Sequence, residues 1–470
     1  MIQRTRGARP TLLLSATVLA GVLLFADVMN RSERAAAVIT LFIAVAGIVS
    51  LMRLIPGRPF TVGSVYLLLF ALFHVGALPY VITGSAPAML AGEGGWFDSP
   101  SRSAAITGVA VSLLAFMAGY AAVLSVRQVN PPPALPDPEP TAPTQRHGLG
   151  ILGMLLVAGG VVLWLAVVVA VSGTAFVTQS YDGFLSRTAG APLPFAYLFI
   201  GVGLGALGLS PDTPLRRWGL VAFAIFAIPA LVIGLRGEVI FPAAAWLIAV
   251  ARRRQIRVRA WHVLVLLAGL AAGSAVRQIR QVGFSPDRLG QVAINPLDGL
   301  VELGGSLRPL VEMQTWHANG EPFVGWGTYW APVERLLLGR ILGLAVPPTS
   351  DDPRVFAATV QDHIGPIGGS PAAESFRSAG LLGIVVVLGL IGLLVGWLDT
   401  RPVDSIPGSA VAMIAYPLLV WVRNDFTPVV FDIVVCLLII CAAKLLDAVL
   451  SAQRRRPPLA VPPRPPVPAR

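Results

Sequence analysis

The sequence predicts an all-α, polytopic membrane protein, and two properties of its 470 residues support this fold class. Hydrophobic residues make up 55% of the chain and charged residues only 13%, whereas roughly a quarter of the residues of a soluble domain are charged. The apolar residues also fall into long runs, and roughly 20 helical residues cross a bilayer core of about 30 Å. We therefore expect most of the chain to form membrane-spanning helices.

Twelve apolar runs follow one another along the chain. The long runs lie at about 11–28, 35–52, 62–82, 104–126, 149–172, 193–209, 218–235, 260–276, 380–398, 406–422 and 427–446. A shorter run, 238–251, also reads as a span, because without it the basic segment RRRQIRVR would lie on the outer side, against the positive-inside rule. The sequence thus predicts about twelve spans, with both termini in the cytoplasm.

These spans divide the chain into six parts. We expect transmembrane helices 1 to 4 in 1–126, a cytoplasmic proline-rich linker in 127–147, helices 5 to 9 in 148–276, an extracytoplasmic loop in 277–378, helices 10 to 12 in 379–450, and a basic, proline-rich cytoplasmic tail in 451–470. The net charge of +11 comes from arginines of the inner loops and tail, which favour anionic membrane lipids and do not indicate nucleic-acid binding. Cys436 and Cys441 lie within the last span, which favours packing over a disulfide or metal site.

The predicted outer loop is the most polar part of the chain. It contains ten of the 24 acidic residues and eight arginines. The stretches PLDGLVELGGSLRPLVEM and VERLLLGRILGLAV alternate leucine or valine with charge at helical spacing, which predicts short amphipathic helices in the membrane interface. Chemistry that requires water is therefore expected in this segment.

Three arginines stand at the expected outer boundary. Arg277 and Arg280 lie one helical turn apart at the end of the ninth span, so both side chains can point the same way. Arg236 lies at the tip of a tight hairpin, IGLRGEV, whose glycines allow a ligand to approach the backbone or simply allow the turn. Such arginines either bind an anion or anchor helix ends by snorkelling.

Further candidates lie inside the loop. Glu374 and Arg377, three residues apart, share a helix face and can meet at one point or form a local ion pair. The aromatic segment WHANGEPFVGWGTYW is typical either of an interfacial belt or of a platform for sugar rings. Its candidates for sugar contact are Trp316, Trp326, Tyr329 and Trp330.

Taken in order, these features resemble the O-antigen polymerases, the Wzy-type polymerases of oligosaccharide repeat units. The resemblance covers roughly residues 150 to 446 and depends mainly on Gly-Ser-x-x-Ala-Glu-x-(aromatic)-x-x-x-Gly at Gly369 to Gly380, together with the arginine placements. Phe376 and Ser378 stand where the family often has tyrosine and asparagine. An arginine and a glycine separated by ten residues, a spacing found in outer loops of some members, occur at Arg354 and Gly365.

The resemblance implies a GT-C-like membrane glycosyltransferase at the outer face of the bacterial plasma (inner) membrane. Such an enzyme moves a growing glycan from undecaprenyl diphosphate to a sugar hydroxyl of another carrier-linked repeat unit, forming O-antigen, capsule or exopolysaccharide. No metal and no cofactor are expected, and its partners would include membrane lipids, a chain-length regulator and a flippase. The leaving diphosphate needs preorganised positive charge, and arginine binds phosphate bidentately. The candidates for this contact are Arg236, Arg277, Arg280 and Arg377.

The acceptor hydroxyl also requires a general base with a pKa near the working pH. The candidates are Glu374, first because of its place in the motif, then His317 beside a tryptophan, and His363; Glu302 also qualifies by location.

Two other functions are alternatives, and the sequence does not strongly distinguish the first of them, a ligase, from a polymerase. A ligase of the same superfamily would pass finished glycan to another acceptor. A twelve-helix transporter or lipid-linked sugar flippase would show two similar halves with charges near the midplane, whereas here the charges gather in one asymmetric loop.

Overall fold

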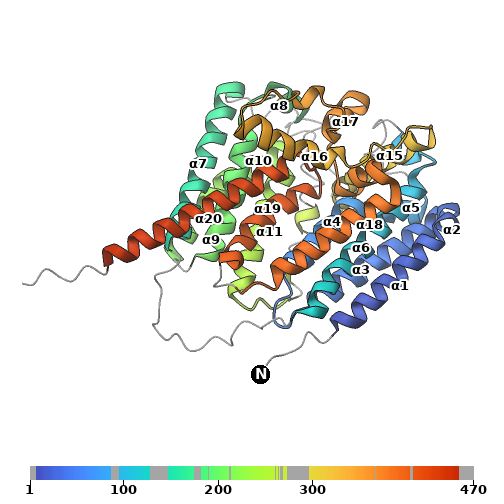
Figure 1. Ribbon diagram of the computed structural model, residues 1–470, viewed down its shortest axis with the longest axis horizontal. Helices are drawn as coiled ribbons and strands as arrows, with labels where there is room; N and C mark the ends of the chain where they lie inside the picture. The colour runs from blue at the N-terminus through green and yellow to red at the C-terminus, as the bar shows by residue number, and fades with distance from the viewer. Residues whose placement is uncertain are drawn as a thin grey trace, which may run out of the picture.

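The computed structural model is mainly helical in the residues that it describes, which are 7–85, 95–127, 147–173, 181–188, 190–210, 213–259, 261–262, 264, 268–271, 296–365, 367–402 and 406–454. No β-strand occurs among these residues. Figure 1 shows the long helices packed side by side, with shorter helices gathered toward one end. The predicted all-α class is confirmed.

The first group of helices is built around α6. The group comprises α1 (Ala8–Leu24), α2 (Ala26–Arg31), α3 (Glu33–Leu54), α4 (Val62–Val75), α5 (Leu78–Thr83), η2 (Trp96–Asp98) and α6 (Arg102–Val126). Helix α6 packs against α1 and α3 and, most extensively, against α18 (Pro371–Asp399). Glycines allow this close approach, since a Cβ at Gly392 would lie 2.2 Å from the Phe116 carbonyl oxygen. Small residues are the usual means by which helices pack closely within membranes.

A second group packs beside the first. It comprises α7 (His147–Ser172), α8 (Tyr181–Arg187), α9 (Leu193–Leu209), α10 (Thr213–Ile233) and α11 (Arg236–Arg253). The buried Trp164 and Phe226 rings meet edge to face between α7 and α10, with centroids 5.2 Å apart. Helices α9 and α11 then connect this group to α19 (Ile406–Trp421).

The predicted outer loop folds into short elements that precede α18. These are α14 (Pro296–Leu303), η5 (Gly304–Ser306), α15 (Leu307–Ala318), α16 (Gly327–Glu334), η6 (Arg335–Ile341), η7 (Thr349–Asp351) and α17 (Phe356–Ile364). After α18 and α19 the chain ends in α20 (Thr427–Arg454). In Figure 1 the helices α15, α16 and α17 lie along the upper end of the bundle, the end at which α18 begins.

Among the described residues, six helices are long and apolar enough to cross a membrane. They are Glu33–Leu54, Arg102–Val126, Gly148–Val171, Pro214–Ile233, Pro371–Asp399 and Thr427–Leu450. Four shorter apolar helices, Ala8–Leu24, Val62–Val75, Leu193–Leu209 and Gly408–Trp421, overlap other predicted spans. Most of the predicted ninth span lies outside the described residues. The multi-pass character is therefore established, while the count of twelve stays a prediction.

A buried carboxylate fixes the far end of α18. Asp399 accepts hydrogen bonds from the backbone N–H groups of Val62 (3.0 Å) and Gly63 (2.9 Å) and from the Tyr120 hydroxyl (3.1 Å). Its carboxylate also lies 3.7 Å from the Arg252 guanidinium. A negative charge at the amino end of α4 is favourable because it meets the positive end of the helix dipole. This network joins α4, α6, α11 and α18 at the end opposite the short helices.

Candidate functional site

Helix α18 is interrupted near its amino end, at the edge of the predicted outer loop. Ala379 (φ −157°, ψ 31°) and Gly380 (φ 63°, ψ −147°) both leave the helical conformation. A side chain at position 380 would be strained at this positive φ, and its Cβ would lie 2.9 Å from Cζ of Phe323. Glycine is therefore required where the helix breaks.

The break frees carbonyl groups that bind the aromatic segment. The carbonyl oxygens of Arg377 and Ser378 accept hydrogen bonds from the N–H groups of Val324 (3.1 Å) and Gly325 (3.0 Å). Carbonyls near the end of a helical stretch need such outside donors, because the next turn no longer supplies them. The segment between α15 and α16 is thus fixed to α18 through its backbone.

The glycine-serine part of the motif explains how α18 begins. Gly369 donates its N–H to the carbonyl of Arg423 (3.2 Å), and a Cβ at Gly369 would lie 2.8 Å from the backbone nitrogen of Asp425. Ser370 is the N-cap, and its hydroxyl accepts a hydrogen bond from the N–H of Ala373 (3.0 Å). The motif therefore packs the start of α18 directly against the turn between α19 and α20.

Glu374 lies in this packed region with no solvent exposure (0%). Its Oε1 accepts a hydrogen bond from the Thr328 hydroxyl (2.6 Å), and its Oε2 accepts from Trp421 Nε1 (3.2 Å) and from the Phe426 N–H (2.9 Å). A buried carboxylate is tolerated when it is hydrogen-bonded in this way. We call Glu374 and these three donors the Glu374 cage. It joins α18 to α16, α19 and the start of α20.

Aromatic rings surround the cage. The Tyr329 ring centroid lies 5.3 Å from that of Phe426 and 6.3 Å from that of Trp421, and those two rings are 4.8 Å apart. Trp326 lies beyond Tyr329 at 6.1 Å, and both Trp326 and Trp330 are exposed. Of the four predicted sugar-contact residues, Tyr329 thus packs against the cage, while Trp326 and Trp330 present open faces.

A small pocket lies beside the break in α18. It has a volume of about 20 Å³ and is lined in part by Trp316, His317, Glu321, Phe376 and Arg377. A cavity of this size accommodates about one water-sized group. The pocket thus brings together three predicted site residues: His317 as a candidate base, Trp316 as a candidate sugar contact and Arg377 as a candidate diphosphate ligand.

The two predicted histidines have similar surroundings. His317 is exposed and stacks on Phe323 at 4.2 Å, with its Nδ1 3.1 Å from the Glu321 carbonyl oxygen. His363 is exposed and lies 4.6 Å from the Trp316 ring, with its Nδ1 2.8 Å from the Thr359 carbonyl oxygen. A carbonyl only accepts, so each Nδ1 carries the proton and each Nε2 is an acceptor in the neutral ring. Only His317 lines the pocket.

Arg377 and Glu374 do not pair with each other. The Arg377 Nη2 donates to the Thr359 hydroxyl (3.1 Å) and to the Pro353 carbonyl (3.3 Å). Glu374 is occupied by its cage donors. The local ion pair considered from the sequence is therefore not formed, and Arg377 instead connects α18 to the segment before α17.

The predicted hairpin arginine lies in the same part of the molecule. Arg236 is the first residue of α11, is buried, and forms an ion pair with Glu302. A Cβ at the next residue, Gly237, would lie 3.5 Å from Nη1 of Arg423, so a second guanidinium lies beside the hairpin. The other two predicted diphosphate ligands, Arg277 and Arg280, lie outside the described residues.

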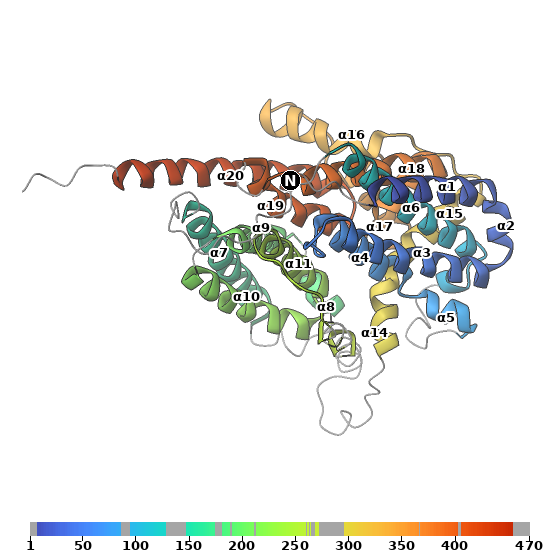
Figure 2. The same ribbon diagram turned by 90° about the horizontal axis from the view of Figure 1, so that it is seen from below.

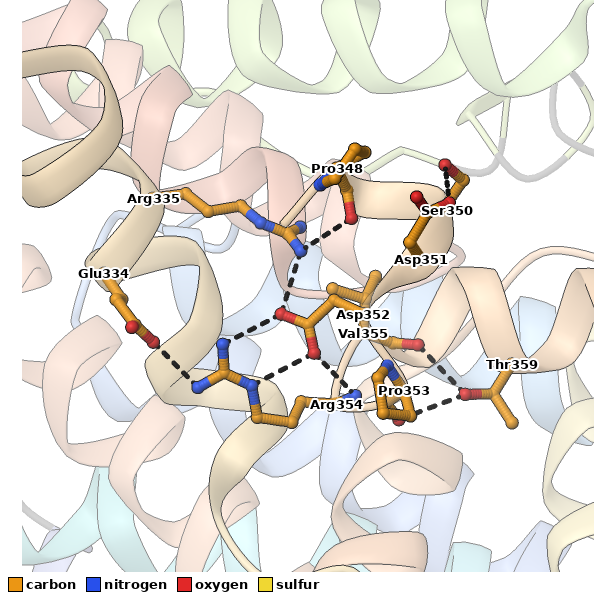
Figure 3. Close-up of polar contacts among 10 residues, drawn as sticks. All are labelled: Glu334, Arg335, Pro348, Ser350, Asp351, Asp352, Pro353, Arg354, Val355 and Thr359. Carbon is orange, nitrogen blue, oxygen red and sulfur yellow. Dashed lines mark hydrogen bonds and ion pairs between the residues drawn. The ribbon is translucent and has the colours of Figure 1, made fainter. Parts of the chain in front are cut away.

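Four charged residues hold the base of the segment between α16 and α17 (Figure 3). Asp352 is buried and accepts hydrogen bonds from Arg354 Nε (3.0 Å), Arg354 Nη2 (2.9 Å) and Arg335 Nη2 (2.9 Å). Arg354 Nη1 also donates to Glu334 (2.7 Å), and Arg335 donates to the Pro348 carbonyl (3.2 Å). The hydrogen bonds from Arg354 hold the pKa of the Asp352 carboxyl below its usual range. We call these residues the Asp352 network.

Replacing Asp352 by asparagine is expected to loosen this segment by roughly 1.5–3 kcal/mol, the range for hydrogen bonds to charged groups. The pKa of Asp352 is lower in the folded than in the unfolded protein. Its stabilisation of the segment is therefore fully present above the unfolded pKa of about 3.9, and it is lost as the pH falls through the lower pKa of the folded state. Limited proteolysis of purified protein against pH should show this loss for wild type and faster cleavage of the variant throughout. Asp351→Asn is the control, since that carboxylate accepts only from Ser350 among the described residues. Equal cleavage of both variants would contradict the prediction.

The sequence did not single out several residues of the site. Thr328, Trp421 and Phe426 supply the cage donors, and Arg423 lies beside the hairpin. Burial raises the pKa of the adjacent Asp425. The available signal was the polar and aromatic segment WVRNDFT, which is unusually rich in such residues for a connection between two apolar runs.

No group of three or more His, Cys, Asp or Glu placed to hold a metal ion occurs within the described part of the chain.

The long apolar helices define a multi-pass membrane protein. Its candidate site is the group of buried polar residues where the short helices before α18 meet the bundle. The chain belongs to the family of the O-antigen polysaccharide polymerase Wzy, which matches residues 12–451. It is also similar to Protein CapE of Staphylococcus aureus, with 22% identity over 212 residues that make up 45% of this chain and 47% of that relative. The match thus spans about half the length of this curated relative. No solved structure matches the chain. The resemblance predicted from the motif is confirmed.

Proposed function

We propose that this protein polymerises lipid-linked oligosaccharide repeat units into a surface polysaccharide at the outer face of a bacterial plasma membrane. Family membership supports polymerisation at a membrane. The observation that carries the proposal is the Glu374 cage. It joins α18, which lines the pocket, to the turn after α19, and this turn holds Arg423 near the hairpin of Arg236. A base and a set of cations are the two things that the transfer requires.

In the proposed reaction the acceptor hydroxyl oxygen attacks the anomeric carbon of the donor glycan. The bond from that carbon to the carrier diphosphate breaks, and the diphosphate leaves with the bonding electron pair. His317 takes the hydroxyl proton at Nε2, since its Nδ1 faces a carbonyl and its ring lines the pocket. Glu374 acts by positioning α18, because its carboxylate is enclosed by three donors.

The arginines stabilise the leaving diphosphate in this proposal. Arg236, Arg277 and Arg280 form the predicted clamp, and Arg423 joins them because its guanidinium lies against the α11 hairpin. Charge on the diphosphate increases as the bond breaks, so fixed cations stabilise the transition state more than the ground state. A GT-C-like architecture, cytoplasmic termini, and chain-length regulator and flippase partners belong to the same proposal.

Glycan analysis of cells that lack this protein tests the function. Single repeat units on the carrier lipid would accumulate if the protein is a polymerase. Long polymer that is not attached to its final acceptor would instead identify a ligase. Carrier-linked units confined to the cytoplasmic leaflet would identify a flippase.

Replacing Arg277 by alanine should nearly abolish polymer in complemented cells. Loss of one charge-assisted donor to a developing oxyanion costs about 2.7–4 kcal/mol, or roughly 10²–10³ in rate. The glycan ladder on a gel is the measurement, with protein abundance in the membrane checked in parallel. Arg288→Ala, in the same predicted loop, is the matched control. A full ladder from Arg277→Ala would remove this residue from the clamp.

A further inference from the structure

An apolar hairpin projects from the site region. After α16, the π-helical η6 leads to a turn at Gly343 (φ 68°), and the chain returns to Pro348. The Leu344 N–H donates to the Leu338 carbonyl (2.8 Å), which closes the hairpin. Figure 2 shows helical turns beside the label of α16 that stand out from the bundle. We call residues 335–348 the apolar hairpin.

The tip of the apolar hairpin carries large exposed aliphatic side chains. Ile341 is 66% exposed and Leu342 63% exposed, and Leu337 and Leu344 are also exposed. The Asp352 network holds both ends of the hairpin through Arg335, so this exposure belongs to a well-fixed element. A fixed apolar patch on a protein surface indicates a binding surface for an apolar partner.

The position of the hairpin identifies the partner as hydrocarbon. The Arg340 guanidinium lies over the Phe431 ring of α20, with Cζ 4.6 Å from the ring centroid. Beyond Phe431, α20 exposes further apolar side chains, among them Leu437, Leu438 and Leu445. The apolar surface of the hairpin therefore continues into the membrane-facing surface of α20.

The same element leads to the Glu374 cage. Helix α16 supplies Thr328 to Glu374 and runs directly into η6. Phe431 lies in the second turn of α20, and Phe426, a cage donor, immediately precedes that helix. An isoprenoid chain lying on this surface would place its diphosphate near both the cage and Arg340. Arg340 has no carboxylate within ion-pair distance among the described residues, so its charge suits an anionic head group.

We propose that the apolar hairpin and the adjoining face of α20 bind the polyprenyl chain of the donor's carrier lipid, with Arg340 beside its diphosphate. The inference rests on the proposed function and names the part of the substrate that this surface recognises. Transfer of a donor with a long carrier should depend on the hairpin, whereas transfer from a short carrier should not.

The test uses the full chain in phosphatidylcholine nanodiscs with repeat-unit donors on undecaprenyl diphosphate or on a two-isoprene diphosphate. Ile341→Ser/Leu342→Ser should raise KM for the long-chain donor by about tenfold or more, given the apolar area lost, with kcat unchanged. KM for the short-chain donor should not change. Leu13→Ser/Leu14→Ser on α1, with similar exposure of 67% and 66%, is the matched control. Size-exclusion profiles of all variants report folding.

A binding measurement separates this inference from the proposed function. A diazirine-bearing undecaprenyl diphosphate without sugar should label the apolar hairpin or α20 in wild type and label the double variant less. Equal changes in KM for both donors, or none, would overturn the inference. If a diazirine-bearing phospholipid labels the hairpin and α20 as strongly as the carrier probe does, the hairpin only anchors the protein in lipid. If no wild-type donor is transferred but the labelling is as expected, the proposed function fails and the polyprenyl site stands.

Discussion

Replacing Glu374 by alanine is expected to abolish polymer formation and to destabilise the protein by roughly 3 kcal/mol or more. The Thr328 hydroxyl, Trp421 Nε1 and the Phe426 N–H all lose their acceptor, a carboxylate that is fully buried. Each buried donor left unsatisfied costs about 1–3 kcal/mol. The start of α18 would then no longer be held against α16 and the turn after α19, and the pocket beside Arg377 would lose its geometry.

Glu374→Gln separates a positioning role from a role as the base. The glutamine carbonyl can accept from Trp421 and Phe426, while its amide donates to the Thr328 hydroxyl, which can act as an acceptor. This variant is therefore expected to keep most of the stability and much of the polymer if Glu374 positions α18. If Glu374 is the general base, as its place in the motif first suggested, glutamine would preserve folding and remove polymer.

Thermal unfolding of purified protein and the glycan ladder from complemented cells measure the two effects. Glu312→Ala is a suitable control, because Glu312 pairs only with Arg308 one turn away on α15, at 3.7 Å, among the described residues. Such a pair contributes about 0–1 kcal/mol. An alanine variant at position 374 that unfolds like the control would contradict the role of the cage.

The helical class, which is confirmed, and the region of the candidate site, which stays a prediction, could both be predicted because both depend on local composition. Apolar runs long enough to span a bilayer are visible without any structure, and so is a polar segment between two of them. The motif around Glu374 was identified in the same way. Its sequence also contains the glycines and the N-capping serine that shape the start of α18.

The partners of those residues could not be predicted, because they come from distant parts of the chain. The cage donors Thr328, Trp421 and Phe426 lie 46, 47 and 52 residues from Glu374. No helical periodicity relates positions so far apart. The break at Gly380 was equally invisible, since a single glycine in an apolar run also fits an intact helix. The spacing of Glu374 and Arg377 allows them to pair, but the three cage donors occupy the Glu374 carboxylate instead.

Replacing His317 by alanine is the second large effect that we expect, with kcat lowered about 10²- to 10⁴-fold, the usual contribution of a general base. His317 is exposed, so its removal should leave stability nearly unchanged, in contrast to Glu374→Ala. Its Nδ1 faces the Glu321 carbonyl, which directs the unprotonated Nε2 away from the backbone. Stacking on Phe323 keeps the ring at the pocket. Transfer by purified protein, with kcat and KM determined separately for wild type and variant, measures this loss.

His363 makes this test specific, because it has the same hydrogen-bonding arrangement without lining the pocket. His363→Ala should lower activity far less than His317→Ala, by loss of packing on Trp316. His262→Ala, in the basic segment after α11, controls for removal of an imidazole away from the site. A larger loss from His363→Ala would move the base to that residue. If His317→Ala and His363→Ala are both fully active and Glu374→Gln makes no polymer, Glu374 is the general base. The cage would then have to open during each transfer.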